Sequence, residues 1–405
     1  MCLHALKGAD SLGFHLRLMT GINISDAAAI AHRASLTWTF YAQLFACSLR
    51  PLAKLGPQPE CFYKGLRLLA IDGVRWSLRN TEKVLNLKRK KHSNQKGECA
   101  AFVKWGSAVL LELGTHQPLA VACSTQGLGH EEGELPIARR TLGALSKNEP
   151  NLLLADRLYG HASFIIEVQK ASAGMTQLLV RVKSNLKGKL VKVLRDGSAL
   201  FEVKACGKGA LKSRSKTLVR EVRAQVQRAG GKVIVVRLWT TLLDEKLYPA
   251  SELIALYTQR WEHELFYREL KHHVAGSSLL KAGSEHTAQG ELAGLIMAAS
   301  ILAEQRVATA QEVDLPPVRL SLLKIGRIVA SLSMLLHLGK GILSEEQSAT
   351  LIRRARKQMA KEAVIPPRTG RRCQRGVRRA VSPWPVIKTR AKADPALSVT
   401  LVPSR

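Results

Sequence analysis

Two apolar runs that each end in an aspartate constrain the fold of this chain more than any other feature. Residues 68–71 precede Asp72, and residues 152–155 precede Asp156. Short, uninterrupted apolar runs are typical of strands buried on both faces of an α/β sheet. Proteins with open α/β sheets bind their ligands at the carboxyl ends of strands. Both aspartates are therefore candidates for binding a metal ion. The alternative is that each aspartate only caps the turn after it.

The rest of the chain extends this α/β pattern. Further apolar runs at 109–113, 119–122 and 178–180 predict strands, and 134–146 and 161–173 have helical patterns between them. We predict an α/β core over residues 66–275, interrupted at about 185–240 by a β-rich insertion of alternating Lys and Val or Leu. Flanking regions complete the predicted organisation: a helical region over 1–60 with a helix start at Ser25, a helical region over 276–363, and a basic tail over 364–405.

A third carboxylate lies on a helix predicted over 250–273. Tyr257, Arg260 and Lys271 lie four or seven positions from Glu264, which places them within about 40° of its direction on a helix. A carboxylate flanked by two cations and a phenol suits a phosphate group, because the cations neutralise its charge and the phenol donates a hydrogen bond. The alternative is an ordinary Arg260–Glu264 ion pair on a solvated face.

Two other acids on the same helix serve as an internal contrast. Glu262 and Glu269 point roughly away from Glu264 at helical spacing, so we expect them on the opposite face. Carboxylate oxygens are hard ligands suited to Mg²⁺ or Mn²⁺.

The seven cysteines are scattered singly, which indicates neither a zinc site nor a disulfide framework.

The charge of the chain points to a polyanionic partner. The formal net charge is +31, and such an excess favours nucleic acid, with a ribosomal or membrane-surface protein as the alternative. Basic stretches at 88–91 and 371–379 are candidates for backbone contacts. No apolar run is long enough to suggest a membrane span, and no nucleotide-binding fingerprint occurs, so we expect neither a membrane nor a nucleotide partner.

The helix motif matches a known signature. The spacing of Tyr257, Arg260, Glu264 and Lys271 is similar to the YREK signature of bacterial insertion-sequence transposases of the DDE superfamily, of the IS-four type and related to the Tn-five transposase. Residues 72–81 resemble the first motif of that family, 153–160 its second, and 240–250 the approach to its third. The resemblance extends over about residues 24–300.

The resemblance implies a fold and a site. The fold would be an RNase H-like catalytic core with the β-rich insertion before the helix of Glu264. Asp72, Asp156 and Glu264 would be the catalytic residues and the ligands of two Mg²⁺ or Mn²⁺ ions. Five residues would contact DNA, among them a tryptophan that stacks on a flipped base unless it is an ordinary core residue: Tyr257, Arg260, Lys271, Arg157 and Trp239.

The resemblance also implies a function. The expected activity is metal-dependent cleavage of insertion-sequence ends and transfer of the strands into target DNA, by a homodimer that pairs two ends in the bacterial cytoplasm, associated with the nucleoid. The chain departs from the family pattern at Val74, where threonine is usual, at Leu158, where glycine is usual, and in a shorter N-terminal region. The alternatives are a truncated remnant that only binds DNA and a host RNase H-like nuclease.

Overall fold

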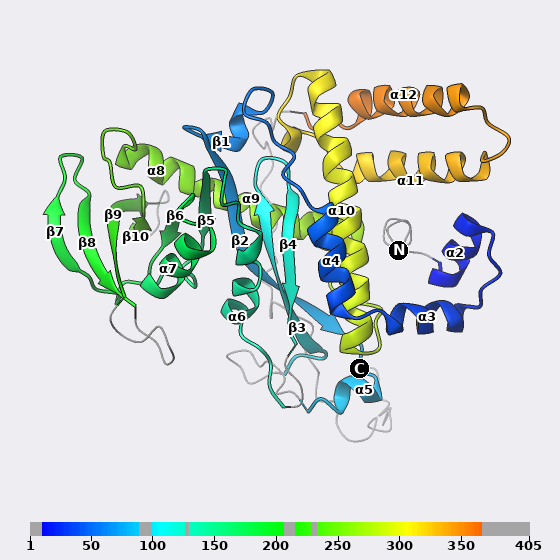
Figure 1. Cartoon of the computed structure of the whole chain (residues 1–405), viewed down its shortest axis with the longest axis horizontal. Helices are drawn as coiled ribbons and strands as arrows, with labels where there is room; N and C mark the ends of the chain where they lie inside the picture. The colour runs from blue at the N-terminus through cyan, green and yellow to red at the C-terminus, as the bar shows by residue number, and fades with distance from the viewer. Residues whose placement is uncertain (1–9, 89–98, 126–128, 206–214, 228–232, 367–405) are drawn as a thin grey trace, which may run out of the picture.

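Among the residues that the structure describes, ten strands form one mixed β-sheet (Figure 1). The computed structural model describes residues 10–88, 99–125, 129–205, 215–227 and 233–366. Nine strands follow one another in the order β4-β3-β2-β5-β6-β10-β9-β8-β7, and the short strand β1 (Phe62–Tyr63) pairs with β2. The β2–β5 and β5–β6 pairs are parallel, and all others are antiparallel.

Each of the five apolar runs of the sequence lies on one of five neighbouring strands, although β2 and β3 extend six or seven residues beyond their runs. This confirms the predicted α/β class, because parallel strands with helices on both faces form the middle of the sheet. The strands are β2 (Leu66–Leu78), β3 (Val103–Glu112), β4 (Gln117–Cys123), β5 (Asn151–Ala155) and β6 (Thr176–Arg181).

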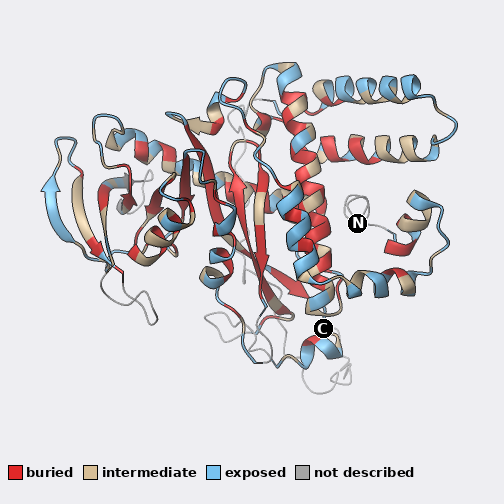
Figure 2. Cartoon of the chain, in the orientation of Figure 1, coloured by how far each residue is buried: buried red, intermediate tan, exposed pale blue. Residues whose placement is uncertain are grey.

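Helices cover both faces of these strands, which explains their continuous apolar character. Successive residues of β5 alternate between two cores: Leu152 and Leu154 belong to the core under α4, α9 and α10, whereas Leu153 and Ala155 belong to the core under α6 and α7. Figure 2 shows these strands as mostly buried, and β5 is buried at every position. Because Asp72 follows Ala70 by two positions on β2, its side chain points to the face that carries α9 and α10.

The stretch predicted as a β-rich insertion continues the main sheet. β10 pairs with β6 through Leu238–Arg181 and the two pairs that follow, so the insertion strands join the sheet edge to edge. Outward from β6, Figure 1 shows these strands on the left. Their bounds are β7 (Lys189–Val193), β8 (Ala199–Lys204), β9 (Lys216–Gln227) and β10 (Val233–Thr240).

Short helices precede the core and connect some of its strands. Ser25 begins a helix as predicted, since its hydroxyl accepts a hydrogen bond from the Ala28 backbone N–H (3.1 Å). An additional helix, α2, lies where the sequence shows no clear periodicity, and it ends at Gly21 with φ of 68°. The elements are α2 (Leu12–Thr20), α3 (Asp26–Ser35), α4 (Trp38–Ser48), α5 (Glu82–Leu85), α6 (Glu134–Arg139) and α7 (Ala162–Ala171).

The first helix candidate of the core is shorter than predicted. The stretch 134–146 forms α6 only to Arg139, followed by a 3₁₀ turn over Leu142–Ala144. The long helix predicted over 250–273 is a continuous path of four segments. These are α8 (Ala250–Tyr257), a 3₁₀ turn (Thr258–Arg260), α9 (Trp261–Glu269) and a π-helical segment (Leu270–Val274).

Three helices form the C-terminal region, α10 (Glu285–Val313), α11 (Leu322–Leu338) and α12 (Glu345–Glu362). Within the described part of the chain, α10 is the helix long and apolar enough to cross a membrane, but 72% of its most apolar window is buried inside the protein. It packs against β4 and α4, as a core helix does. In Figure 1, the α11–α12 hairpin and the α2–α3 pair project to the same side of α10.

Candidate active site

Asp72 and Asp156 lie beside each other where the parallel pairing of β2 and β5 ends. The last paired residues are Ile71 and Ala155, each directly before an aspartate. The apolar run suggested that Asp72 lies at the end of a strand. β2 instead continues to Leu78, so Asp72 lies within the strand. The reason is the long antiparallel strand β3, which pairs with β2 beyond the point where β5 stops. The resulting fork leaves both carboxylates at one edge of the parallel pair.

Both aspartates also make the local hydrogen bonds of the capping alternative. Asp156 Oδ1 accepts from the Leu158 backbone N–H at 2.6 Å, and Asp72 Oδ1 accepts from the Gly73 backbone N–H at 2.9 Å. These bonds orient the carboxylates through their Oδ1 atoms. Capping and ligand binding are therefore compatible at both positions, because a carboxylate has two oxygens.

The helix that carries Glu264 is anchored across β2 and β3. His263 is buried, and its Nε2 donates to the carbonyl oxygen of Val109 on β3 at 3.0 Å. Burial lowers the pKa of His263 to about 3, so the ring is neutral. The hydroxyl of Tyr267 donates to the main-chain carbonyl of Asp72 at 2.7 Å. The two bonds fix α9 relative to the strand that bears the first aspartate.

A buried ion-pair network fastens the other side of α9. His116 Nδ1 lies 2.8 Å from Glu269 and its Nε2 3.0 Å from Glu262, and Arg306 on α10 donates to Glu269 at 2.6 Å. Burial alone would lower the pKa of His116, but the two carboxylates raise it overall. Burial would likewise raise the pKa of Glu269, yet Arg306 and His116 hold it well below its usual range. Glu262 and Glu269 thus face away from Glu264, as the helical spacing predicts.

Arg260 joins Asp72 to Glu264. Its Nη2 donates to Glu264 Oε1 at 2.8 Å, and its Nη1 lies 3.9 Å from Asp72 Oδ2. The predicted ion pair on the helix exists, but it also reaches a strand residue distant in sequence, so it is more than a solvated surface pair. The side chains of Asp72 and Glu264 are 20% and 36% exposed, which leaves both accessible to a large substrate.

The pKa of Asp72 is raised by burial and by two acidic neighbours. Burial, followed by the charges of Glu134 and Asp156, raises its pKa to about 7, against the opposing effects of the Gly73 hydrogen bond and of Arg260. A nearby cation would lower this pKa, and a perturbed pKa of this kind is common at functional sites.

The remaining members of the helix motif face the same end of the sheet. The Tyr257 hydroxyl donates to the carbonyl oxygen of Ala155 at 3.2 Å, directly before Asp156, and burial raises the pKa of Tyr257 to about 12. Lys271 donates to the carbonyl oxygen of Arg75 at 3.3 Å, with its ammonium 5.6 Å from the centre of the Trp76 ring. The fold therefore places a phenol and two cations around the carboxylates.

Trp239 corrects one prediction. Its side chain is 2% exposed within the core under α7, and its Nε1 donates to Glu221 at 2.9 Å. An indole with both faces packed has no surface on which a base could stack. The interpretation of Trp239 as a DNA contact was wrong, and the core interpretation is correct. The reason is that β10 joins the sheet beside β6, so that this side chain points inward.

Other predicted DNA contacts lie at the surface or outside the described residues. Arg157 is exposed directly after Asp156, and Lys88 is exposed at the end of the segment after α5. Residues 89–91 and 371–379 lie outside the described residues. The roles of Arg157 and of these basic stretches stay predictions.

The donor set fits a divalent metal ion in kind. The carboxylates of Asp72, Asp156 and Glu264 are hard oxygen donors suited to Mg²⁺ or Mn²⁺. Over the described parts of the chain, no three acidic, histidine or cysteine side chains already converge closely enough to hold one ion. The Glu264 carboxylate is paired with the Arg260 guanidinium at 2.8 Å.

Sequence reasoning missed several residues that build this site. Glu134 and Tyr159 contact each other at 2.8 Å beside the aspartates, Tyr267 holds the Asp72 backbone, and His116 and Arg306 anchor α9. An acid in the first turn of a helix, such as Glu134, usually stabilises that helix, so its position gives no signal of another role. The buried network depends on pairing across more than a hundred residues, which helical spacing does not report.

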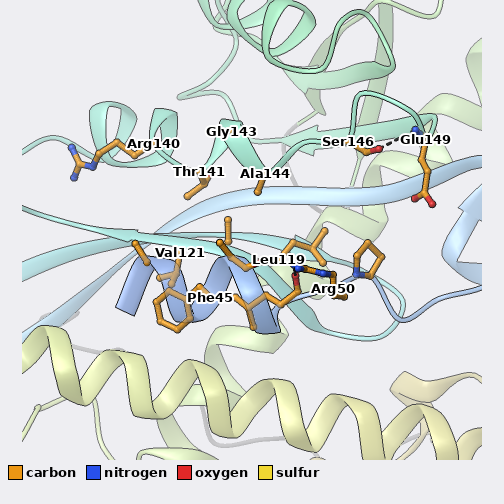
Figure 3. Close-up of a pocket in the computed structure, with 15 residues that line it drawn as sticks. Phe45, Arg50, Leu119, Val121, Arg140, Thr141, Gly143, Ala144, Ser146 and Glu149 are labelled. Atoms are coloured by element: carbon orange, nitrogen blue, oxygen red, sulfur yellow. Dashed lines mark hydrogen bonds between the residues drawn. The ribbon is translucent and has the colours of Figure 1, made fainter. Parts of the chain in front are cut away.

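A separate cavity does not belong to this site. It has a volume of about 590 Å³ and lies between α4, the edge strand β4 and the segment 140–149, with Phe45, Leu119 and Val121 on one side and Thr141 and Ala144 on the other (Figure 3). None of the clustered carboxylates lines it. The side chains of Asp72 and Glu264 are instead partly exposed.

Two comparisons with known proteins bear on this arrangement. The family model described as "Transposase DDE domain" matches residues 63–301, which span the strands and the helix that carry all three carboxylates. The chain is also 25% identical over 290 residues to "Transposase InsG for insertion sequence element IS4" of Escherichia coli (strain K12). That match covers 71% of this chain and 62% of the relative. The transposase DDE domain is RNase H-like, which confirms the predicted core.

Proposed function

Since the chain belongs to the transposase DDE domain family, we propose that it is a transposase that cuts and joins DNA with metal ions held by Asp72, Asp156 and Glu264. The observation that carries the proposal is the link made by Arg260 between Asp72 and Glu264, next to Asp156 at the end of β5. Asp72 and Glu264 come from distant segments and share Arg260, and the charge of Asp156 acts on Asp72; such repulsion between like charges does not stabilise the fold.

The chemistry requires charge to be stabilised on both the attacking and the leaving oxygen of a phosphodiester. Two divalent ions, when bound by these carboxylates, would stabilise both oxygens and lower the pKa of the attacking water or 3′-hydroxyl. Arg260, which now neutralises Asp72 and Glu264, is the group best placed to receive a DNA phosphate, since a guanidinium matches phosphate geometry in a bidentate pair. Lys271 and Tyr257 flank it with an ammonium and a phenol donor.

The proposed substrates are the terminal inverted repeats of the element and its target DNA. A homodimer would pair two ends, and the strands would be cut and transferred in the cytoplasm, at the nucleoid. The net charge of +31 supports a polyanionic partner, and binding should weaken steeply as salt rises. The YREK positions and the cut-and-paste route belong to this proposal.

The test is cleavage of a plasmid that carries the gene's own flanking DNA, with Mg²⁺ or Mn²⁺. We expect end-specific cleavage by the wild type and its loss in Asp72→Asn, Asp156→Asn and Glu264→Gln. Glu252→Gln is the matched control and should cut normally, because Glu252 is an exposed acid on α8 in an ion pair with Lys64. Binding without cleavage by the wild type would favour a DNA-binding remnant, and cleavage without preference for the ends would favour a nuclease.

A further inference from the structure

Glu134 is a fourth acid at the site that the proposed function does not use. It is the first residue of α6, on the opposite face of the sheet from α9. Its Oε1 accepts two hydrogen bonds, from the Gly73 backbone N–H at 3.2 Å and from the Tyr159 hydroxyl at 2.8 Å. Gly73 follows Asp72 directly, and Tyr159 lies three residues after Asp156. One carboxylate oxygen therefore ties together the two segments that carry the aspartates.

The Glu134 side chain lies against β2 at Gly73, where the strand has no Cβ atom. A Cβ atom added to Gly73 would lie 2.3 Å from Glu134 Cγ and 2.4 Å from its Cδ, which no real contact tolerates. Only glycine at this position lets the carboxylate approach the strand. The pairing of β2 with β5 has ended two residues earlier, so the Gly73 N–H is available to Glu134 and not to a neighbouring strand.

A side chain that only joined the Asp72 and Asp156 segments by hydrogen bonds would not need a charge. A neutral acceptor could bind the same two donors, whereas a carboxylate next to Asp72 and Asp156 adds repulsion. Glu134 is the charged neighbour that contributes most to the raised pKa of Asp72, ahead of Asp156. The two hydrogen-bond partners of Glu134, a backbone N–H and a phenol, carry no cation, and the charge of opposite sign that interacts with it is Arg75. A divalent cation near these three acids would turn this repulsion into attraction.

We propose that Glu134 is a positioning residue of the metal site, which holds the Asp72 and Asp156 segments at a fixed separation and strengthens the attraction for divalent cations. The inference rests on the proposed function, since it assumes that these aspartates bind metal. With Glu134, the site has four carboxylates, which balances the charge of two divalent ions. Outer partners that orient metal ligands typically change affinity by about 10–100-fold when they are removed.

The test is titration of the full-length protein with Mn²⁺, followed by calorimetry and by electron paramagnetic resonance of free Mn²⁺. Glu134→Gln keeps an acceptor for Gly73 and Tyr159 but removes the charge, and Tyr159→Phe removes one hydrogen bond but keeps the charge. We expect Glu134→Gln to weaken Mn²⁺ binding by about tenfold or more and Tyr159→Phe to weaken it less. The matched control is Glu167→Gln, an acid in an ion pair with Arg139 outside the site, which should bind Mn²⁺ as the wild type does.

A second readout separates a charge role from a structural one. In chelator at pH 8, the charge role predicts a higher melting temperature for Glu134→Gln than for the wild type, because one repelling charge is gone. A lower melting temperature together with unchanged Mn²⁺ affinity would overturn the inference and leave the proposed function intact. If the wild type itself binds no Mn²⁺, the proposed metal-dependent function fails first.

Discussion

The raised pKa of Asp72 gives the metal-free protein a distinctive pH dependence. In the folded chain this pKa is about 7, against an ordinary value of 3.8 for an aspartate. Between these values the folded state keeps a proton on Asp72 that the unfolded state has lost, so stability falls as pH rises. A difference of roughly 3 units is worth about 4 kcal/mol at 1.36 kcal/mol per unit, an upper limit because the side chain is partly exposed.

Asp72→Asn isolates this effect, because asparagine stays neutral at every pH. In chelator, the free energy of unfolding of the variant should exceed that of the wild type by a margin that grows from near zero at pH 4 to as much as about 4 kcal/mol at pH 8. Urea denaturation followed by circular dichroism measures both, and other titrating groups cancel in the difference. Added Mn²⁺ should reverse the order, since only the wild type retains the full ligand set. Parallel pH profiles of the two proteins in chelator would refute the reasoning.

Three further predictions follow from the surroundings of the site. Glu269→Gln leaves His116 and Arg306 without their shared counter-charge and should destabilise the fold by about 3–5 kcal/mol in urea; a loss below 1 kcal/mol would mean that the network does not anchor α9. Trp239→Phe should lower the melting temperature but leave DNA affinity unchanged, so a selective loss of affinity would restore a base-stacking role. Lys271→Met should weaken DNA binding and reduce the slope of log affinity against log salt by about one, with Mn²⁺ binding unaltered; an unchanged slope would place Lys271 off the phosphate backbone.

The part of the site carried by local pattern was predictable from sequence. Residue runs that alternate between two cores must be apolar at every position, so the strands before Asp72 and Asp156 were visible in the sequence. Helical spacing likewise separated Glu264 from Glu262 and Glu269, and the contacts of these residues agree with it.

The part that depends on tertiary approach was not predictable. Glu134 reaches the site only because α6 packs against β2 where Gly73 leaves room, and no periodicity encodes that meeting. Trp239 was misassigned because its distance along the chain from the helix motif does not reveal which way β10 faces. The position of Asp72 inside a long strand depends on its partner β3, whose extent the apolar run did not show.

The most direct measurement of the central claim is an anomalous-scattering map from crystals of the protein with its end DNA and Mn²⁺. The account predicts manganese peaks bounded by Asp72, Asp156 and Glu264, with the Glu264 carboxylate released from Arg260 and the guanidinium turned to a DNA phosphate. Manganese bound elsewhere, or a site in which Arg260 still holds Glu264 while DNA is bound and cut, would contradict it.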